Sequence, residues 1–469
     1  MATTVTLRTW QRDALVAFAD RPTPSFLAVA CPGAGKTTFA LAAVRAELGG
    51  QPRPVCVTVP TAHLKYQWAE SAAHFGLHLE PDWNPDSGLA SDMHGVIVTY
   101  AQAASSHHAL GALLADGLVV LDEVHHAASD RVWGEGVKAA FEGASVRLLL
   151  SGTPFRSDDN PIPFVRYTYG DHGEAVCDFE YGYGDALIDG GVVRPVFFPR
   201  FDGHMEWMDA SGALKDATFA DEVDRDDWSA RLRTALASDG NWLPTVLAKA
   251  NQRLSRIRQD HPDAGGLVIA TDQGHAREIA ARIETISGEA AEIVLSDDPK
   301  ASDRIATFGS SNRRWIVAVR MVSEGVDIPR LRVAVFATTT TTTLFFRQAV
   351  GRVARWTTGM TTQPAYFFVP DDHRLRGHAA AIAMQRRHAV EQRSTSERAA
   401  PDPAAFNDDA EQMSLFTALS STVLEESWMT DGLDLDEQQV VAGAGDLVGH
   451  PFDLPPPPPL AGRGYINST

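Results

Sequence analysis

The 469-residue sequence predicts an α/β protein with two doubly wound domains in tandem. Within residues 25–156, five short apolar strands each end in a polar turn. A second series of such strands runs from residue 265 to 369, after a stretch of different composition. Apolar strands that alternate with helical segments are typical of parallel sheets covered by helices on both faces. At about 150 residues per domain, the length also fits two or three domains.

A glycine loop at residues 30–38, Ala-Cys-Pro-Gly-Ala-Gly-Lys-Thr-Thr, separates a buried strand from a helical segment. Such a loop surrounds an anion with backbone N–H groups, and the helix N-terminus and lysine add positive charge. An ordinary glycine-rich turn is the alternative, which the flanking strand and helix disfavour. We therefore expect a nucleoside triphosphate site formed by Gly33, Gly35, Lys36, Thr37 and Thr38, with the Thr37 hydroxyl on Mg²⁺.

Two carboxylates, Asp122 and Glu123, directly follow the apolar strand 118–121. They lie at the carboxyl edge of the predicted sheet, where α/β proteins hold ligands. We expect Asp122 to hold Mg²⁺ and Glu123 to polarise an attacking water. A structural pair of surface acids is the alternative, and four preceding apolar residues disfavour it.

Gln11 precedes Lys36 by 25 residues, at the start of an amphipathic segment that ends near Asp20. Its amide both donates and accepts, so it can read an adenine edge. A role in capping the helix explains this residue equally well.

Hydroxyl-bearing turns follow several strands. Thr61, Thr99 and Thr271 each follow an apolar strand, and residues 151–156 form Ser-Gly-Thr-Pro-Phe-Arg. Hydroxyls and neighbouring N–H groups at such turns suit phosphate contacts. As isolated features, these threonines are better explained as ordinary strand ends.

The second series of strands has no phosphate loop, but a helical segment at 344–355 carries Arg352 and Arg355. Three residues apart on a helix, the two arginines share a face and can reach a γ-phosphate across a cleft. Arginine fingers contribute roughly 10³–10⁵ in rate in other nucleotide hydrolases. A salt-bridged helix face is the alternative.

Composition divides the chain into five parts. We predict domain 1 at 1–195, a helical linker or insertion at 196–262, domain 2 at 263–372, a C-terminal helix at 373–400, and an acidic, proline-rich, partly disordered tail at 401–469.

The net charge of −19 resides largely in the tail, where 12 acidic residues face one basic residue. The other 400 residues carry 40 basic and 48 acidic groups, or a net charge of −8, which allows a local basic groove for nucleic acid.

Three scattered cysteines disfavour a disulfide framework or a structural metal. Without an apolar run of about 18 residues or a secretion signal, we expect a cytoplasmic protein with no membrane partner, bacterial or phage-encoded from its composition.

Four motifs occur in one order along the chain: A-x-x-G-x-G-K-T, D-E-x-H, S-G-T-P and Q-x-x-G-R-x-x-R. From about Leu7 to Val369 the chain thus resembles superfamily 2 helicases, which have two tandem RecA-like domains. Ala30, in place of the usual first glycine, is then the family's own variant.

The resemblance implies a role for each matching residue. Gln11 would read adenine, and Lys36, Thr37, Asp122 and Glu123 would bind and activate MgATP. Residues that couple the site to domain movement would be His125, Ser151 and Thr153. Those that approach the nucleotide from domain 2 would be Gly325, Asp327, Gln348, Arg352 and Arg355. The nucleic-acid track would include Thr61, Thr99, Arg156, Thr271 and Ser323.

Within the superfamily, Asp-Glu-Val-His and Val-Ser-Glu-Gly-Val-Asp-Ile-Pro resemble the XPB-type and type III restriction-subunit-type DNA translocases. This resemblance implies an ATP-dependent DNA helicase or translocase that uses ATP and Mg²⁺. An ATP-gated switch that binds nucleic acid and recruits partners without travelling is one alternative, and an RNA helicase is another. No nuclease motif is present, so cleavage or repair would require a partner.

In the tail, Gln412–Phe416 resembles the short peptides that dock on bacterial sliding clamps. The alternative, the first turn of a helix that packs on domain 2, is favoured because short patterns match by chance.

Overall fold

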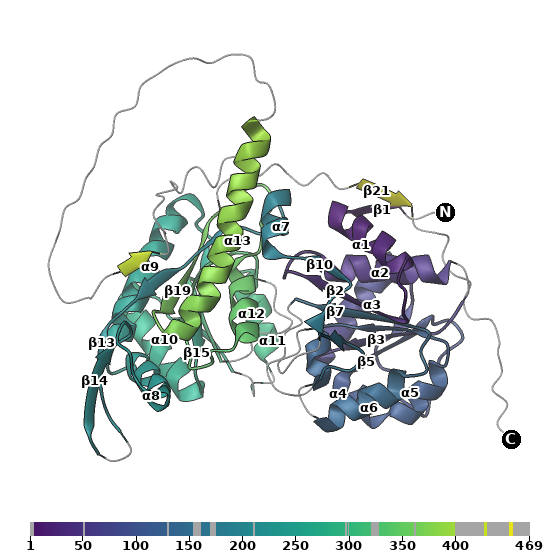
Figure 1. Ribbon diagram of the computed structural model, residues 1–469, viewed down its shortest axis with the longest axis horizontal. Helices are drawn as coiled ribbons and strands as arrows, with labels where there is room; N and C mark the ends of the chain where they lie inside the picture. The colour runs from purple at the N-terminus through teal and green to yellow at the C-terminus, as the bar shows by residue number, and fades with distance from the viewer. Residues whose placement is uncertain are drawn as a thin grey trace.

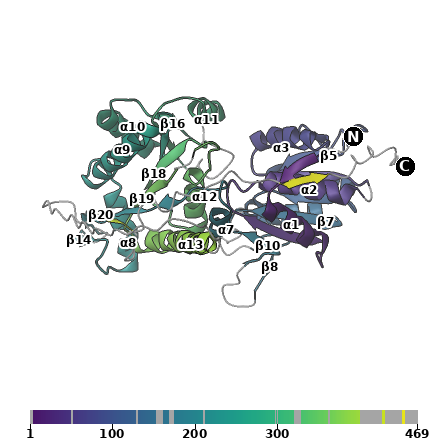
Figure 2. The same ribbon diagram turned by 90° about the horizontal axis from the view of Figure 1, so that it is seen from above.

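The computed structural model describes residues 4–49, 52–128, 131–152, 161–168, 175–209, 212–295, 298, 300–319, 328–360, 363–398, 426–428 and 450–453. Two α/β lobes lie side by side, the N-terminal one purple to blue and the other teal to green (Figures 1 and 2). The predicted fold class, parallel sheets flanked by helices in two tandem domains, is confirmed.

Domain 1 is built on a seven-stranded parallel sheet of order β10-β2-β7-β6-β3-β5-β4. Its strands are β2 (Ser25–Ala30), β3 (Val55–Val59), β4 (Leu79–Glu80), β5 (Gly95–Thr99), β6 (Leu118–Leu121), β7 (Val146–Ser151) and β10 (Phe179–Tyr181). Alternate residues of a strand point to opposite faces, so Phe26 and Leu27 of β2 enter different hydrophobic clusters. Both faces are therefore buried, which explains why these strands are apolar throughout.

Helices cover each face of this sheet. On one face lie α1 (Thr9–Ala19), α2 (Lys36–Leu48) and α3 (Ala62–His74). On the other lie α4 (Tyr100–Ser105), α5 (His107–Leu113) and α6 (Arg131–Phe141), and a short 3₁₀ helix, Val124–Ala128, follows β6. A two-stranded pair, β8 (Arg166–Tyr167) with β9 (Ala175–Val176), precedes β10, and α7 (Tyr183–Asp189) follows it.

Domain 2 has a sheet of order β16-β17-β15-β18-β19-β12-β20, with β11 also paired to β19. The strands predicted from the sequence are β15 (Gly265–Ala270), β16 (Glu292–Val294), β17 (Trp315–Val319), β18 (Leu331–Ala337) and β19 (Ala365–Pro370). One face packs on α8 (Arg225–Ala235), α9 (Trp242–Asp260) and α10 (Gln273–Ser287). The other packs on α11 (Ala301–Gly309), α12 (Thr343–Val353) and α13 (His373–Arg398).

Residues 196–262, which we expected to be helical, begin with four strands. β11 (Val196–Phe197) and β12 (Pro199–Phe201) pair in parallel with β19, so this segment extends the domain 2 sheet. A hairpin of β13 (His204–Met208) and β14 (Leu214–Thr218) follows, before helices α8 and α9. The alternation of β13, with Met205 and Trp207 buried, is the period of a half-buried strand rather than of a helix.

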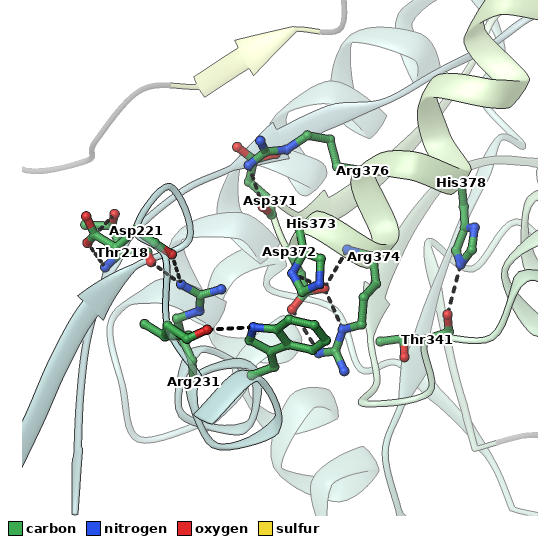
Figure 3. A network of polar contacts seen from close by, with 12 residues as sticks. Thr218, Asp221, Arg231, Thr341, Asp371, Asp372, His373, Arg374, Arg376 and His378 are labelled. Atoms are coloured by element: carbon green, nitrogen blue, oxygen red, sulfur yellow. Dashed lines mark hydrogen bonds and ion pairs between the residues drawn. The ribbon is translucent and has the colours of Figure 1, made fainter. Parts of the chain in front are cut away.

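A polar network joins this insertion to the start of α13 (Figure 3). Arg231 of α8 is 1% exposed and donates to the backbone carbonyls of Thr218 and Asp221. Nearby, the fully buried Asp372 accepts two hydrogen bonds of 2.9 Å from the Arg374 guanidinium. The two parts meet at Trp228 of α8, whose ring lies 4.1 Å from that of His373 and 5.7 Å from the Arg374 guanidinium, and these contacts hold the insertion against domain 2.

The acidic tail contains two strands that the sequence did not predict. β20 (Glu426–Trp428) pairs antiparallel with β12 in domain 2. β21 (His450–Asp453) pairs antiparallel with β1 (Thr4–Leu7) beside domain 1. The clamp-like segment Gln412–Phe416 lies outside the described residues. Within the part of the chain that the structure describes, no helix has the length and apolarity needed to cross a membrane.

Candidate nucleotide-binding site

The glycine loop connects β2 to α2 as predicted. Gly33 and Gly35 have φ values of 85° and 93°, a region of backbone conformation that glycine adopts without strain. Gly35 is the N-cap of α2, and Lys36, Thr37 and Thr38 form the first turn of that helix. The free N–H groups of a 13-residue helix thus open at the loop, which is the arrangement that binds phosphate.

Three side chains at the start of α1 hold this loop from outside. Arg8 donates through Nη1 to the carbonyls of Gly33 and Ala34, at 3.1 and 2.8 Å. Trp10 donates through Nε1 to the same Ala34 carbonyl at 3.1 Å. Gln11 donates through Nε2 to the Gly35 carbonyl at 2.9 Å. Of these three residues the sequence motifs indicate only Gln11, and the one sign of Arg8 and Trp10 is that they stand next to it in the sequence.

Gln11 is only 2% exposed, and its Oε1 accepts the backbone N–H of Arg8 at 2.8 Å. The capping alternative is therefore correct for this residue. Its predicted adenine-reading role is compatible with the free lone pair of Oε1 and stays a prediction.

Lys36, Asp122 and Glu123 meet at the carboxyl ends of β2 and β6. Lys36 Nζ lies 3.1 Å from Glu123 Oε1 and donates to the Ala30 carbonyl at 3.2 Å. Glu123 has a φ of 48°, unusual for a residue with a side chain, and such conformations cost about 1–3 kcal/mol. Strain of this kind gathers at functional sites, because the surrounding structure must hold it in place.

Two aromatic residues that the sequence did not indicate hold Asp122. Trp68 of α3 donates through Nε1 to Asp122 Oδ2 at 2.9 Å. The Tyr100 hydroxyl donates to the Asp122 backbone carbonyl at 2.8 Å. Both residues come from helices distant in sequence, so no local pattern could have identified them.

The environments of the two carboxylates separate their pKa values. Burial, followed by the neighbouring charge of Glu123, raises the pKa of Asp122 to about 6. Burial also favours the neutral form of Glu123, but Lys36, His125 and the N–H of Gly152 outweigh it and lower its pKa. Glu123 is thus the more readily ionised of the two carboxylates, whereas burial disfavours the charged form of Asp122.

His125 connects these acids to domain 2. Its Nδ1 lies 3.4 Å from Ser151 Oγ and 3.7 Å from Glu123 Oε2, and its Nε2 lies 3.2 Å from Nε2 of Gln348. An amide nitrogen only donates, so Gln348 is the donor of the hydrogen bond between the domains. One imidazole therefore contacts Glu123, Ser151 and a helix of the other domain.

Helix α12 lies directly on the glycine loop. A Cβ atom added to Gly351 would come within 2.6 Å of the Pro32 ring, so only glycine permits this approach. The Arg355 guanidinium lies against Gly33, since a Cβ added to Gly33 would come within 3.0 Å of Nη1. Beside this contact is a cavity of about 230 Å³, lined by Cys31 and Cys177 from domain 1 and by Arg347 and Gln385 from domain 2.

The expectation that Arg352 and Arg355 share a helix face is wrong. Helix α12 ends at Val353, so only Arg352 is helical. Arg355 lies beyond the C-cap residue Ala354 and forms an isolated β-bridge with Val193, and the Arg194 N–H donates to the Ala354 carbonyl at 2.8 Å. The segment that crosses between the domains, rather than helical periodicity, positions Arg355.

The three described threonines of the predicted nucleic-acid track follow β3, β5 and β15. Thr61 and Thr99 are the N-caps of α3 and α4, and the Thr99 hydroxyl accepts the Gln102 N–H at 3.2 Å. Thr271 donates to the Ala337 carbonyl at 3.4 Å in domain 2. These contacts explain the threonines as strand ends and helix caps, and a role toward nucleic acid stays a prediction. The other predicted site residues, Thr153, Arg156, Ser323, Gly325 and Asp327, lie outside the described residues.

Residues 4–156 match the family of the type III restriction enzyme res subunit. An uncharacterized protein of Mycobacterium leprae is 41% identical over 440 residues, which are 91% of this chain and 73% of that protein. An uncharacterized protein of Mycobacterium tuberculosis is 45% identical over 82% of this chain, and the match spans 64% of that relative's length. A protein of Sulfurisphaera tokodaii named DNA 3'-5' translocase XPB2 is 24% identical over 69% of this chain and 73% of its own length.

Solved structures share the fold. The type ISP restriction-modification enzyme LlaBIII bound to DNA superposes with a TM-score of 0.54 at 14% identity, over 83% of this chain and 30% of that one. A fragment assigned as the HsdR subunit of a type I restriction enzyme from Vibrio vulnificus gives a TM-score of 0.54 at 16% identity, over 79% and 65%. In its ordered motifs, in the match of residues 4–156 to the res-subunit family and in its two RecA-like domains, the chain resembles the superfamily 2 helicases, and within them the XPB-like proteins and type III restriction subunits.

Proposed function

We propose that this chain is a nucleic-acid-stimulated ATPase that moves along DNA or separates its strands. The observation that carries the proposal is the contact from Glu123 through His125 to Gln348. A carboxylate suited to orient water is thereby linked to the other domain through a polar contact of 3.7 Å and a hydrogen bond of 3.2 Å, so hydrolysis and domain movement share one path.

The residues present fit ATP and Mg²⁺. The loop offers the N-terminus of α2, and Asp122 and Thr37 offer the oxygen ligands that Mg²⁺ prefers. When bound, the metal would neutralise charge that develops on the phosphates. Lys36 would bind the outer phosphates, Asp122 and Thr37 would hold the metal, and Arg355 and Arg352 would supply positive charge from domain 2.

In this proposal, Glu123 orients the attacking water. His125, which contacts both Glu123 and Gln348, couples this site to domain 2. The two domains would close on ATP and open after hydrolysis. The surfaces that contact the strand backbone would move with them, so that the two domains contact the backbone in turn. Contacts to phosphates are sequence-tolerant and salt-sensitive, so we expect binding to weaken steeply with salt.

Two relatives support DNA as the track. The Sulfurisphaera tokodaii relative is named a DNA translocase, and the LlaBIII structure is described as bound to DNA. A nuclease or repair partner, and a sliding clamp bound through Gln412–Phe416, stay proposals of lower rank. ATPase rates with single-stranded DNA, duplex DNA and RNA test the choice of track, and a rate that rises with DNA length distinguishes movement from a switch.

Glu123→Gln tests the proposed chemistry. It should retain ATP and DNA binding and lower turnover by about 10²–10⁴, the range typical of a lost general base. Glu142→Gln, at an exposed glutamate of the same domain, is the control and should turn over normally. Undiminished turnover in Glu123→Gln would remove Glu123 from this role.

A further inference from the structure

The acidic tail returns to the N-terminus of the chain. Strand β21 pairs with β1 in antiparallel register, with Phe452 opposite Val5 and His450 opposite Leu7 (Figures 1 and 2). Within the described residues these strands form a sheet of two, so β21 is the strand partner of β1. Pro451 lacks an N–H, and proline is tolerated at such an edge.

The pairing also buries an apolar side chain. Phe452 is partly buried and packs, as Val5 does, against the hydrophobic cluster that contains Leu7 and Trp10. A two-stranded sheet is only marginally stable by itself, so this packing must supply much of the stability of the pair. Phe452 therefore anchors the tail on domain 1.

Strand β1 leads without a break into the residues that hold the glycine loop. Leu7, its last residue, is fully buried, and the next residue, Arg8, donates to Gly33 and Ala34. Gln11 also packs closely against the glycine loop, because a Cβ atom added to Gly35 would come within 2.7 Å of Gln11 Nε2. A displacement of β1 would thus be transmitted directly to the loop.

We propose that His450–Asp453 is a positioning element of the nucleotide site. By pairing with β1, this segment holds Arg8 and Gln11 against the glycine loop and raises the affinity for nucleotide, with Phe452 as the positioning residue. The inference rests on the proposed function, because it assumes that the loop binds a nucleotide. The tail is fixed to domain 2 as well, through β20 on β12.

The test measures binding of a fluorescent ATP analogue with Mg²⁺ by the full chain, without nucleic acid. Phe452→Ala, and a chain that ends at residue 449, should each raise Kd about five- to tenfold, while kcat at saturating ATP changes less than twofold. Phe452→Leu should retain most of the affinity because it preserves the apolar contact. A synthetic peptide of residues 448–456, added in excess, should restore affinity to the shortened chain.

The control variant alters β20, the strand through which the tail pairs with domain 2. Trp428→Ala, in β20 on domain 2, should leave nucleotide affinity unchanged. Equal affinity in the intact chain, Phe452→Ala and the shortened chain would overturn the inference while leaving the proposed function intact. Failure of the peptide to restore affinity, or a loss of kcat at unchanged Kd, would also overturn it. Absence of nucleotide binding by the intact chain would instead contradict the proposed function.

Discussion

The two domains have parallel sheets of the same kind but place different chemistry at their edges. At the carboxyl ends of the domain 1 strands, Lys36 lies 3.1 Å from Glu123, and the neighbouring Asp122 accepts a hydrogen bond from Trp68. In domain 2, β15 is followed by Thr271, and β18 leads into a run of threonines. Within the described residues, domain 1 thus carries charged groups at these strand ends, whereas β15 and β18 of domain 2 are followed by hydroxyl groups.

Domain 2 contributes through α12 and the residue just after it. Gln348 contacts His125, Gly351 contacts Pro32, and Arg355 lies against Gly33. In the proposed function, domain 1 binds the nucleotide, whereas hydrolysis needs groups from both domains. Substitutions in domain 2 should therefore spare binding and reduce turnover.

The largest effect is expected from Arg355→Ala. Loss of a cation beside the phosphate loop should lower ATP turnover by about 10³ or more, the magnitude typical of arginine fingers, with ATP affinity changed only slightly. Arg313→Ala, at an exposed arginine of domain 2 that pairs with Glu292, is the matched control. Turnover within twofold of the unaltered protein would remove Arg355 from the site.

A smaller effect is expected from the contact between α12 and the loop. Gly351→Ala forces a methyl group to within 2.6 Å of Pro32, and such overpacking costs about 1–3 kcal/mol, or about 5- to 150-fold in turnover. Gly377→Ala, in α13 with open space around it, should leave turnover unchanged and stabilise the helix by about 0.5–1 kcal/mol. If both variants hydrolyse ATP normally, the close approach of α12 is not needed for activity.

The smallest expected effect is a pH dependence of Mg²⁺ binding to domain 1. Because burial raises the pKa of Asp122 to about 6, this carboxylate takes up a proton as the pH falls through 6 and then no longer attracts a metal ion. The apparent affinity for Mg²⁺, from ATPase titrations, should fall about tenfold per pH unit below that value. Asp122→Asn should bind Mg²⁺ weakly at every pH. An affinity in the unaltered protein that does not change between about pH 5 and 8 would contradict this assignment.

Features that depend on short stretches of sequence could be predicted. The glycine loop, the apolar strands and the Asp-Glu pair each occupy fewer than ten consecutive residues, and the structure places them as expected. The position of Arg355 depends on a distant contact. The sequence predicts a helical period that continues past Val353, whereas pairing with Val193, about 160 residues earlier, decides where Arg355 lies.

Features created by distant contacts could not be predicted. Trp68 and Tyr100 hold Asp122 from separate helices, and no local pattern distinguishes them from core aromatics. Similarly, β11, β12, β20 and β21 are short, and each exists because a strand elsewhere in the chain offers an edge. Strand propensity in so few residues is too weak to reveal such partners.

The contact between His125 and Gln348 allows the most direct test that the site is shared between the domains. A double-mutant cycle would compare ATP turnover in His125→Ala, Gln348→Ala and the double variant. If the two side chains act as one path, each single variant should lose about tenfold and the double variant no more than the worse single one, a coupling of about 1.4 kcal/mol. Losses that simply multiply in the double variant would show that the two residues act independently and would contradict the account.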